Sequence, residues 1–504
     1  MQTGKVILFN PRSAGAKHRI PNSILQVAAS IHGQVPYVFV DGNLEPDPEE
    51  VIDAYLATGE YAVLALTCMP GPQLRQAIPI TKHMKARYPE LVVIWGGYFA
   101  TNQYKTVMDS GWVDYIIHGP GDHAFPTLLE AVKAGSDVSS IQNLIYKKEG
   151  QVIRNPAAQL PDMDALPALP YDYLSSFYDM HRYLGRTFLG KRTIAYHSSF
   201  GCPFTCSFCA VVPIYKARWK GMSAERIHRD VMHLKKTYGA DAIEFHDNNF
   251  FVSEARTVRF AELIASEGMQ WWGEGRIDTL HKYSDESLQK IRDAGCKMIF
   301  FGAETGNDEV LKRMDKGGTQ TGQQIKDFAA RLKRIGIVPE YSFVLGLPAE
   351  TEVEVLKQID EDIAFIREIK EINPEAEIII YTYSPVPTEG SDLFKEVSEA
   401  GFQFPQHLED WLSPSWENFD LRRNPLTPWL TRAAVDRIRN FETVLNGYHP
   451  TASDFRIRGW KKTVMRMASG WRYHSGIYEQ PLEVKLLQKI WKYRRPEKEG
   501  FYAE

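Results

Sequence analysis

The segment GCPFTCSFC, residues 201–209, carries three of the five cysteines of this 504-residue chain. Its C-x3-C-x2-C spacing directly follows TIAYHS (193–198), which is typical of a buried strand. Three thiolates on one short loop can hold three irons of a cubane iron–sulfur cluster. The other cysteines, Cys68 and Cys296, have no ligand-like spacing, and no Cys or His pair that would complete a zinc site follows nearby. The pattern predicts a cluster with one iron open to a small chelating molecule.

Five more apolar runs follow this segment at spacings of roughly 25–45 residues, which leave room for one helix between each pair. They are AIEFHDNNF (242–250), QWWGEGR (270–276), KMIFFGAET (297–305), VPEYSFVLG (338–346) and AEIIIYTYS (376–384). An eight-fold βα barrel needs about 250 residues. Six βα units therefore predict a partial parallel barrel over residues 191–390.

The chain before this block shows the same alternation. KVILFN (5–10), YVFVD (37–41), YAVLALT (61–67), LVVIWGG (91–97) and VDYIIHG (113–119) predict strands with helices between them. Residues 1–135 are therefore expected to form an α/β, doubly wound parallel sheet of Rossmann type. Such sheets bind ligands at the carboxyl ends of their strands. The candidate binding residues there are Asn10, Asp41, Asn43, Thr67, Gly96, Gly97 and Gly119.

Two further regions complete the predicted organisation. Residues 136–190 are proline-rich and predict a linker between the domains. Residues 391–504 show helical periodicity and many Trp, and the stretch 456–498 holds twelve Lys or Arg against three Glu. The Trp residues suit a helical core, and the alternative is a contact with anionic membrane headgroups.

Composition narrows the class of protein. Hydrophobic residues make up 44% and charged residues 24%, as in a globular protein, and the formal net charge is −4. That balance gives no reason to expect nucleic-acid binding. No apolar run reaches the roughly 20 residues of a membrane-spanning helix, and the N-terminus does not look like a signal peptide. We expect a cytoplasmic protein, membrane-associated if the basic C-terminal region binds lipid.

The cysteine spacing after the first barrel strand resembles the radical S-adenosylmethionine (radical SAM) superfamily. The resemblance implies that Cys202, Cys206 and Cys209 hold a 4Fe-4S cluster, and that Phe208 packs near the SAM adenine. In that family SAM chelates the open iron and is cleaved to a 5′-deoxyadenosyl radical. A reductant such as flavodoxin or ferredoxin is implied as partner.

Residues at successive strand ends extend the resemblance to SAM binding. Asp247 and Asn248 stand where many relatives have Gly-Gly-Glu and would bind the SAM amino group. Glu274 and Arg276 follow at the third strand, with Arg276 available for the SAM carboxylate. Glu304 would bind the ribose hydroxyls, and Gly346 begins a Gly-Leu-Pro turn against the adenine.

The order of sheet, linker, barrel and helical tail resembles cobalamin-binding radical SAM enzymes. Gly96-Gly97 is similar to the start of the Gly-Gly-x-His-x-Thr loop of these enzymes, and Phe99 stands where that loop has His. Gly119-Pro120-Gly121-Asp122 is similar to their Gly-Glu-Gly-Glu turn. Gly121 thereby joins the candidate cobalamin residues. The D-x-H-x-x-G motif that supplies an axial histidine is absent, and Asn43 stands in its place in the nearest match. A sheet domain that has lost its ligand is the alternative.

These resemblances favour an oxygen-sensitive, cobalamin-dependent enzyme that methylates an unactivated carbon of a small-molecule substrate. The layout is also similar to anaerobic magnesium-protoporphyrin monomethyl ester cyclases, so a radical oxidative cyclase or oxygen-inserting enzyme acting on a porphyrin-like or lipid substrate is the first alternative. An iron–sulfur redox sensor or scaffold without turnover is the second. The sequence does not identify the substrate.

Overall fold

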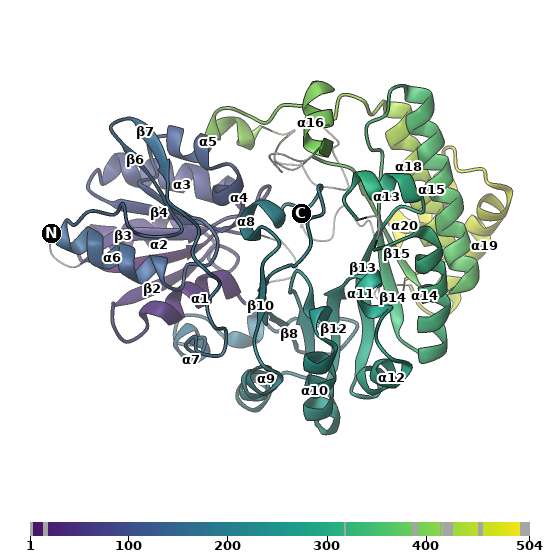
Figure 1. The fold of residues 1–504 in the computed structure, drawn as a ribbon, viewed down its shortest axis with the longest axis horizontal. Helices are drawn as coiled ribbons and strands as arrows, with labels where there is room; N and C mark the ends of the chain where they lie inside the picture. The colour runs from purple at the N-terminus through teal and green to yellow at the C-terminus, as the bar shows by residue number, and fades with distance from the viewer. Residues whose placement is uncertain are drawn as a thin grey trace.

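The computed structural model describes residues 4–13, 19–316, 319–385, 392–413, 416, 427–451 and 457–493. The first sheet, the second sheet and a group of C-terminal helices follow one another across the molecule (Figure 1). The fold class is the predicted one, an α/β chain with a parallel-rich first sheet, a partial parallel barrel of six strands and a helical C-terminal region.

The first sheet has the order β2-β1-β3-β4-β5-β6-β7, in which β1 to β5 are parallel. All five predicted strands are present. Buried side chains of α1 and α6 pack on one face and those of α2 and α3 on the other, which makes the sheet doubly wound. The bounds are β1 Lys5–Asn10, α1 Asn22–Ile31, β2 Tyr37–Asp41, α2 Pro48–Ala57, β3 Tyr61–Thr67, α3 Leu74–Arg87, β4 Val92–Gly96, α4 Gly97–Asn102, α5 Tyr104–Asp109, β5 Tyr115–Ile117 and α6 Ala124–Ala134.

The segment predicted as a linker contributes to this sheet. β6 (Leu144–Lys148) and β7 (Gln151–Arg154) form an antiparallel hairpin that pairs with β5 and extends its edge. Its turn residues, Glu149 and Gly150, both have positive φ, as a two-residue hairpin turn requires. The chain then crosses to the barrel through α7 (Tyr171–Leu174) and η1 (Met180–Arg182).

The second sheet consists of six parallel strands in the order β15-β14-β13-β12-β11-β8, so the described strands form an open arc. Each predicted barrel strand is present. The strand bounds are β8 Thr193–Tyr196, β11 Ala242–Phe245, β12 Gln270–Gly275, β13 Cys296–Glu304, β14 Val338–Leu345 and β15 Glu377–Thr382. The helical segments between them are α9 Ala224–Tyr238, η2 Phe250–Val252, α10 Glu254–Ile264, η3 Ala265–Glu267, α11 Ile277–Leu280, α12 Asp285–Asp293, α13 Asp308–Arg313, α14 Gly322–Ile335 and α15 Glu352–Ile372.

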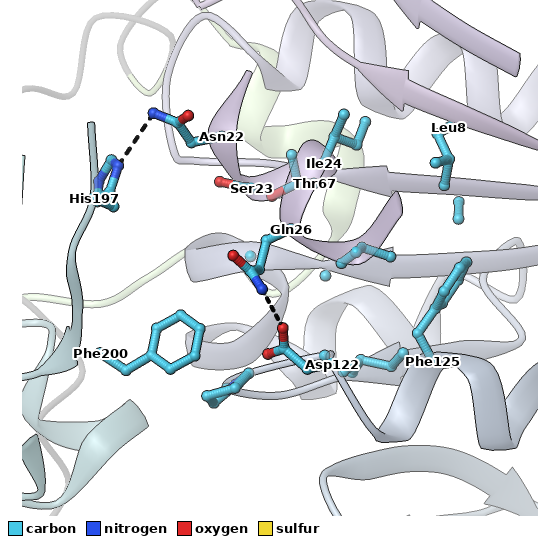
Figure 2. Close-up of a pocket in the computed structure, with 18 of the residues that line it drawn as sticks. Leu8, Asn22, Ser23, Ile24, Gln26, Thr67, Asp122, Phe125, His197 and Phe200 are labelled. Carbon is cyan, nitrogen blue, oxygen red and sulfur yellow. Dashed lines mark hydrogen bonds between the residues drawn. The ribbon is translucent and has the colours of Figure 1, made fainter. Parts of the chain in front are cut away.

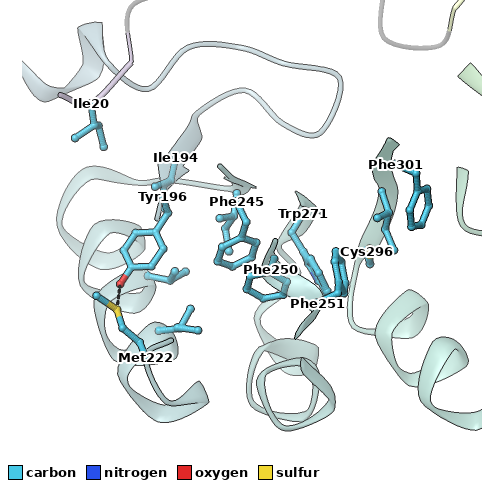
Figure 3. Packing of buried hydrophobic residues seen from close by; sticks show 14 of the residues in the cluster. Ile20, Ile194, Tyr196, Met222, Phe245, Phe250, Phe251, Trp271, Cys296 and Phe301 are labelled. Atoms are coloured by element: carbon cyan, nitrogen blue, oxygen red, sulfur yellow. Dashed lines mark hydrogen bonds between the residues drawn. The ribbon is translucent and has the colours of Figure 1, made fainter. Parts of the chain in front are cut away.

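Aromatic side chains fill the space between these strands and their helices (Figure 3). Trp271 is fully buried and contacts Phe245, Phe250 and Phe260, and its indole N–H donates to the Ala294 carbonyl at 3.0 Å. Cys296 lies in this core, where burial raises the pKa of its thiol. Its surroundings are those of an apolar core residue.

The C-terminal region is helical, as predicted. α16 (Asp392–Glu399) and η4 (Leu408–Leu412) precede α18 (Arg432–Tyr448), α19 (Trp460–Ser475) and α20 (Leu482–Ile490). α18 packs against α15 and β15, and α19 and α20 pack on α18. The expected domain boundary at residues 390 and 391 lies outside the described residues. Of the described helices, none is long and apolar enough to cross a membrane.

Candidate active site

The cysteine loop is held by a small antiparallel pair, β9 (Ser199–Gly201) and β10 (Trp219–Gly221). Gly201 has φ +74, and a Cβ there would lie 2.1 Å from the Arg218 carbonyl oxygen, so this turn requires glycine. Farther along the loop, the Ser207 amide donates to the Met314 carbonyl at 3.0 Å. These contacts fix the loop beside the barrel at the point where β8 ends.

The three thiols are close enough to influence one another. Burial, and to a lesser degree the neighbouring thiols of Cys206 and Cys202, raises the pKa of Cys209 to about 12. Burial likewise raises the pKa of Cys202. Among the described residues no three His, Cys, Asp or Glu side chains are grouped to hold one metal ion. A cubane cluster does not need such a group, because each thiolate binds a different iron, and binding would displace the thiol protons.

Arg276 lies at the end of β12 against the cysteine loop. Its Nη1 donates to the Cys206 sulfur at 2.9 Å, and its guanidinium lies 3.8 Å from the centre of the Phe204 ring. Two further bonds, of 3.0 and 2.7 Å, pair it with the buried Asp278 carboxylate. Arg276 was predicted from the sequence to bind the SAM carboxylate. In the structure its side chain contacts the cysteine loop through Cys206.

The turn after β11 has one unsatisfied side chain. Asp247 is fully buried and accepts hydrogen bonds from the backbone amide and the hydroxyl of Ser198 and from the hydroxyl of Ser199. Asn248 is exposed. Asn249 is fully buried with its amide within hydrogen-bonding reach of the Cys202 thiol, and no nitrogen or oxygen atom of the described residues pairs with that amide. A buried amide with so few partners can bind a polar ligand, so Asn249 is a candidate that was not predicted from the sequence.

A second buried ion pair lies near the first, close enough for the Lys316 charge to act on Asp278. Lys316 donates to Glu304 at 2.5 Å and to the Gly302 carbonyl at 2.6 Å, and its ammonium lies 5.7 Å from the centre of the Phe208 ring. Glu304 has φ +65, which turns the chain at the end of β13. Lys316 was not predicted, because only the tertiary fold brings it to Glu304.

Two other predicted SAM residues have distinct surroundings. The Gly346 carbonyl accepts a hydrogen bond from the Trp429 indole at 3.0 Å, so the turn after β14 contacts the C-terminal region. Glu274 is half-buried on β12, where burial raises the pKa of its carboxyl to about 7. Part of the Glu274 population therefore holds a proton near neutral pH.

A cavity of about 290 Å³ lies where the carboxyl ends of the first sheet meet β8 and β11 of the barrel (Figure 2). Five predicted cobalamin residues line it, namely Thr67, Gly96, Gly97, Gly119 and Gly121. Its inner part is apolar and is formed by Leu8, Ile24, Val27, Ala65, Ile94, Ile117 and Phe125. Bare glycine backbone at the mouth lets a large flat ligand approach closely.

Polar side chains of the cavity wall also suit a ligand. Asp122 accepts from Gln26 at 2.5 Å through one oxygen, while its other oxygen has no partner among the described residues, and burial raises the pKa of its carboxyl. The buried side-chain oxygen of Asn22 also lacks a hydrogen-bond partner among the described residues. Orphaned polar atoms beside an apolar pocket fit a molecule such as cobalamin, which has both amide groups and an apolar base.

Two histidines of the barrel line the same cavity. His197 follows β8 and His246 follows β11, and their rings lie 6.1 Å apart. Burial, together with His246, lowers the pKa of His197 to about 4, so its imidazole is neutral at pH 7. Neither histidine was predicted from the sequence as a site residue. Their positions directly after predicted barrel strands were the available signal.

The remaining predicted cobalamin residues form a separate cluster. Asp41 accepts hydrogen bonds from Asn10 at 3.0 Å, from Asn43 at 2.9 Å and from the Tyr183 hydroxyl at 2.8 Å. The Asp41 amide donates to the Tyr178 hydroxyl at 3.0 Å. None of these residues lines the cavity. The cluster joins the ends of β1 and β2 to the segment that crosses to the barrel.

Two family models match the chain. The Radical SAM superfamily matches residues 196–361, and the B12 binding domain matches residues 18–129. An uncharacterized methyltransferase of Pyrococcus horikoshii is 26% identical over 380 residues, which cover 72% of this chain and 80% of that protein. Anaerobic magnesium-protoporphyrin IX monomethyl ester cyclase of Rubrivivax gelatinosus is 24% identical over 425 residues, which cover 82% of this chain and 70% of that protein.

Solved structures share the fold. The radical S-adenosylmethionine methyltransferase TsrM from Kitasatospora setae, with cobalamin and a 4Fe-4S cluster bound, superposes with a TM-score of 0.67 at 15% identity over 97% of this chain and 98% of that chain. The cobalamin-dependent S-adenosylmethionine radical enzyme OxsB, with aqua-cobalamin and S-adenosylmethionine bound, superposes with a TM-score of 0.68 at 14% identity. This match covers 100% of this chain and 77% of that chain.

Proposed function

A chain that joins a B12-binding domain to a radical SAM domain is a radical SAM enzyme, and from that premise we propose that it methylates an unactivated carbon of a small-molecule substrate. Such a carbon offers no nucleophile, so its C–H bond must be broken by a radical. When bound, the cluster with SAM supplies a 5′-deoxyadenosyl radical, and cobalamin supplies the methyl group.

We assign the cofactor-holding roles to residues whose surroundings suit them. Cys202, Cys206 and Cys209 hold the cluster, and Arg276 orients the Cys206 sulfur. Asn249, whose amide lies beside the Cys202 sulfur, would offer its remaining hydrogen bonds to the polar end of SAM. Glu304 serves the ribose hydroxyls while it keeps its bond to Lys316.

One observation carries the methyl-transfer proposal: the cavity is lined at once by the carboxyl edge of the first sheet and by the ends of β8 and β11. Because the cysteine loop follows β8, a ligand in that cavity lies next to the radical-generating site. His197 and His246 stand at this border. The His197 Nδ1 accepts a hydrogen bond from the Asn22 amide at 3.3 Å, so the neutral imidazole carries its proton on Nε2 and can donate it to a ligand.

The test uses anaerobically reconstituted protein and SAM. We expect about four irons per chain, retained cobalamin, and two products, 5′-deoxyadenosine from hydrogen abstraction and S-adenosylhomocysteine from methyl donation. Cys206→Ala should lose the cluster and both products, while Cys296→Ala, in the apolar core, should keep them. SAM cleavage by Cys206→Ala would contradict the ligand assignment.

The second candidate is a radical oxidative cyclase, favoured by the similarity to the Rubrivivax gelatinosus enzyme over 82% of this chain. It predicts 5′-deoxyadenosine without S-adenosylhomocysteine. A redox sensor without turnover predicts cluster absorbance and neither product. The ratio of the two products therefore separates all three functions without knowledge of the substrate.

A further inference from the structure

The exposed apolar side chains of this molecule are concentrated in one place. Ten large hydrophobic residues are exposed among the described residues, and eight of them lie between residues 460 and 490. We call these eight the outer face: Trp460, Val464, Met467, Trp471, Ile477, Leu482, Leu486 and Ile490. The other two lie elsewhere, Met69 in the loop between β3 and α3 and Val353 on α15. Scattered exposed hydrophobics are ordinary, whereas a contiguous group marks an interaction surface.

Helical spacing arranges seven of these residues in two stripes, one on α19 and one on α20, and Ile477 lies between the two helices. On α19 the exposed residues recur at intervals of four, three and four, and on α20 at intervals of four. The opposite sides of both helices, which include Met465 and Tyr473 of α19 and Val484 of α20, are buried. Because α19 and α20 pack on one another and on α18, the stripes point away from the protein. α19 lies at the edge of the molecule farthest from the first sheet (Figure 1).

The surroundings of the outer face are basic. Residues 457–493 contain eight Lys or Arg and two Glu, although the whole chain has a net charge of −4. Arg472 is paired with Glu483, and most of the other cations are exposed, among them Lys462, Lys485 and Lys489. Exposed apolar stripes with tryptophan and a positive rim are complementary to a negatively charged lipid surface.

We propose that the outer face docks this enzyme onto an anionic lipid bilayer. The tryptophans and aliphatic side chains enter the headgroup region, and the lysines contact the lipid phosphates. The helices lie in the plane of the interface, which requires no membrane-spanning segment. The inference does not rest on the reaction that the barrel performs.

The test is flotation of the full-length protein with two kinds of vesicle, phosphatidylcholine alone and phosphatidylcholine with an equal part of phosphatidylglycerol. We expect binding only to the second, reversed by high salt, with a blue shift of tryptophan fluorescence. Lys485→Gln with Lys489→Gln should weaken binding by about 30-fold at low salt, at about 1 kcal/mol for each lysine. Met467→Glu with Leu486→Glu should weaken it by more than about 100-fold, because apolar insertion is lost and charge repulsion is added.

The matched control alters an equally exposed apolar residue and an exposed lysine elsewhere. Val353→Glu with Lys395→Gln should bind vesicles as the unaltered protein does. Equal binding to neutral and anionic vesicles, or no binding to either, would overturn the proposal. The proposal would also be overturned if light scattering showed a dimer and if Met467→Glu with Leu486→Glu dissociated it. The outer face would then be an interface between two copies of this chain.

Discussion

The contact between Arg276 and Cys206 predicts how the protein sets the reduction potential of its cluster. An electron added to the cluster is attracted by the guanidinium and repelled by the Asp278 carboxylate behind it. With an effective dielectric constant of about 20, a charge about 5 Å away contributes about 3 kcal/mol and one about 8 Å away about 2 kcal/mol. For a one-electron couple, about 1.4 kcal/mol corresponds to about 59 mV.

Arg276→Gln should therefore lower the midpoint potential by about 130 mV, and Asp278→Asn should raise it by about 90 mV. The double variant removes the whole ion pair, and its midpoint potential should lie only about 40 mV below that of the unaltered protein. The single variants also leave one buried charge unpaired, which costs about 3 kcal/mol of folding free energy, and the double variant relieves this cost.

The assay is a redox titration of the reconstituted cluster followed by electron paramagnetic resonance, with iron content measured first. Arg276→Lys keeps the charge and serves as the control if Arg276→Gln assembles poorly. Equal midpoint potentials for the unaltered protein and Arg276→Gln would refute the reasoning, because they would place the guanidinium away from the cluster sulfur.

Two further predictions concern the cavity and the barrel. A Cβ at Gly96 would meet no protein atom closer than 3.8 Å, so Gly96→Ala should keep the melting temperature but lose the retained cobalamin. A Cβ at Gly97 would lie 2.5 Å from the Thr67 side chain, so Gly97→Ala should lose cobalamin and also melt at a lower temperature. Unchanged cobalamin content in Gly96→Ala would contradict a close approach of the ligand to this backbone. Burial raises the pKa of Glu274 to about 7, so the cofactor-free protein should lose stability as pH rises from about 4.5 to 7. Glu274→Gln should recover about 3 kcal/mol at pH 8 and nothing at pH 4 in urea unfolding, and an equal effect at both pH values would contradict it.

Strand periodicity in the sequence predicted the five parallel strands of the first sheet and the six of the barrel, because buried parallel strands are continuous apolar runs. The hairpin of β6 and β7 was not predicted. Its strands are short, end in lysine or arginine and directly precede a proline-rich stretch, so they resemble part of a linker. The Glu149-Gly150 pair between two short β-prone runs was the signal that could have identified it.

Residue roles were less predictable than strands, because a strand end places a side chain at an edge without naming its partner. Asn10, Asp41 and Asn43 lie at the carboxyl edge as expected, yet they bond to one another and to Tyr183. Arg276 lies at its predicted strand end, yet Asp278, two residues later, turns it toward the cysteine loop. Only the tertiary structure shows these pairings, since the polar residue types alone suit both a ligand and an internal partner.

The two sheets explain why one chain carries both cofactor domains. In a parallel sheet ligands bind at the carboxyl edge, and here the carboxyl edges of both sheets border a single cavity. The crossing segment maintains this arrangement, because the buried hydroxyls of Tyr178 and Tyr183 bond to Asp41 of the first sheet. A radical is consumed by the first reactive group it meets, so the methyl transfer that we propose requires the two cofactor sites to be held at a fixed, short distance. The packed interface between the sheets, rather than any one residue, provides that distance.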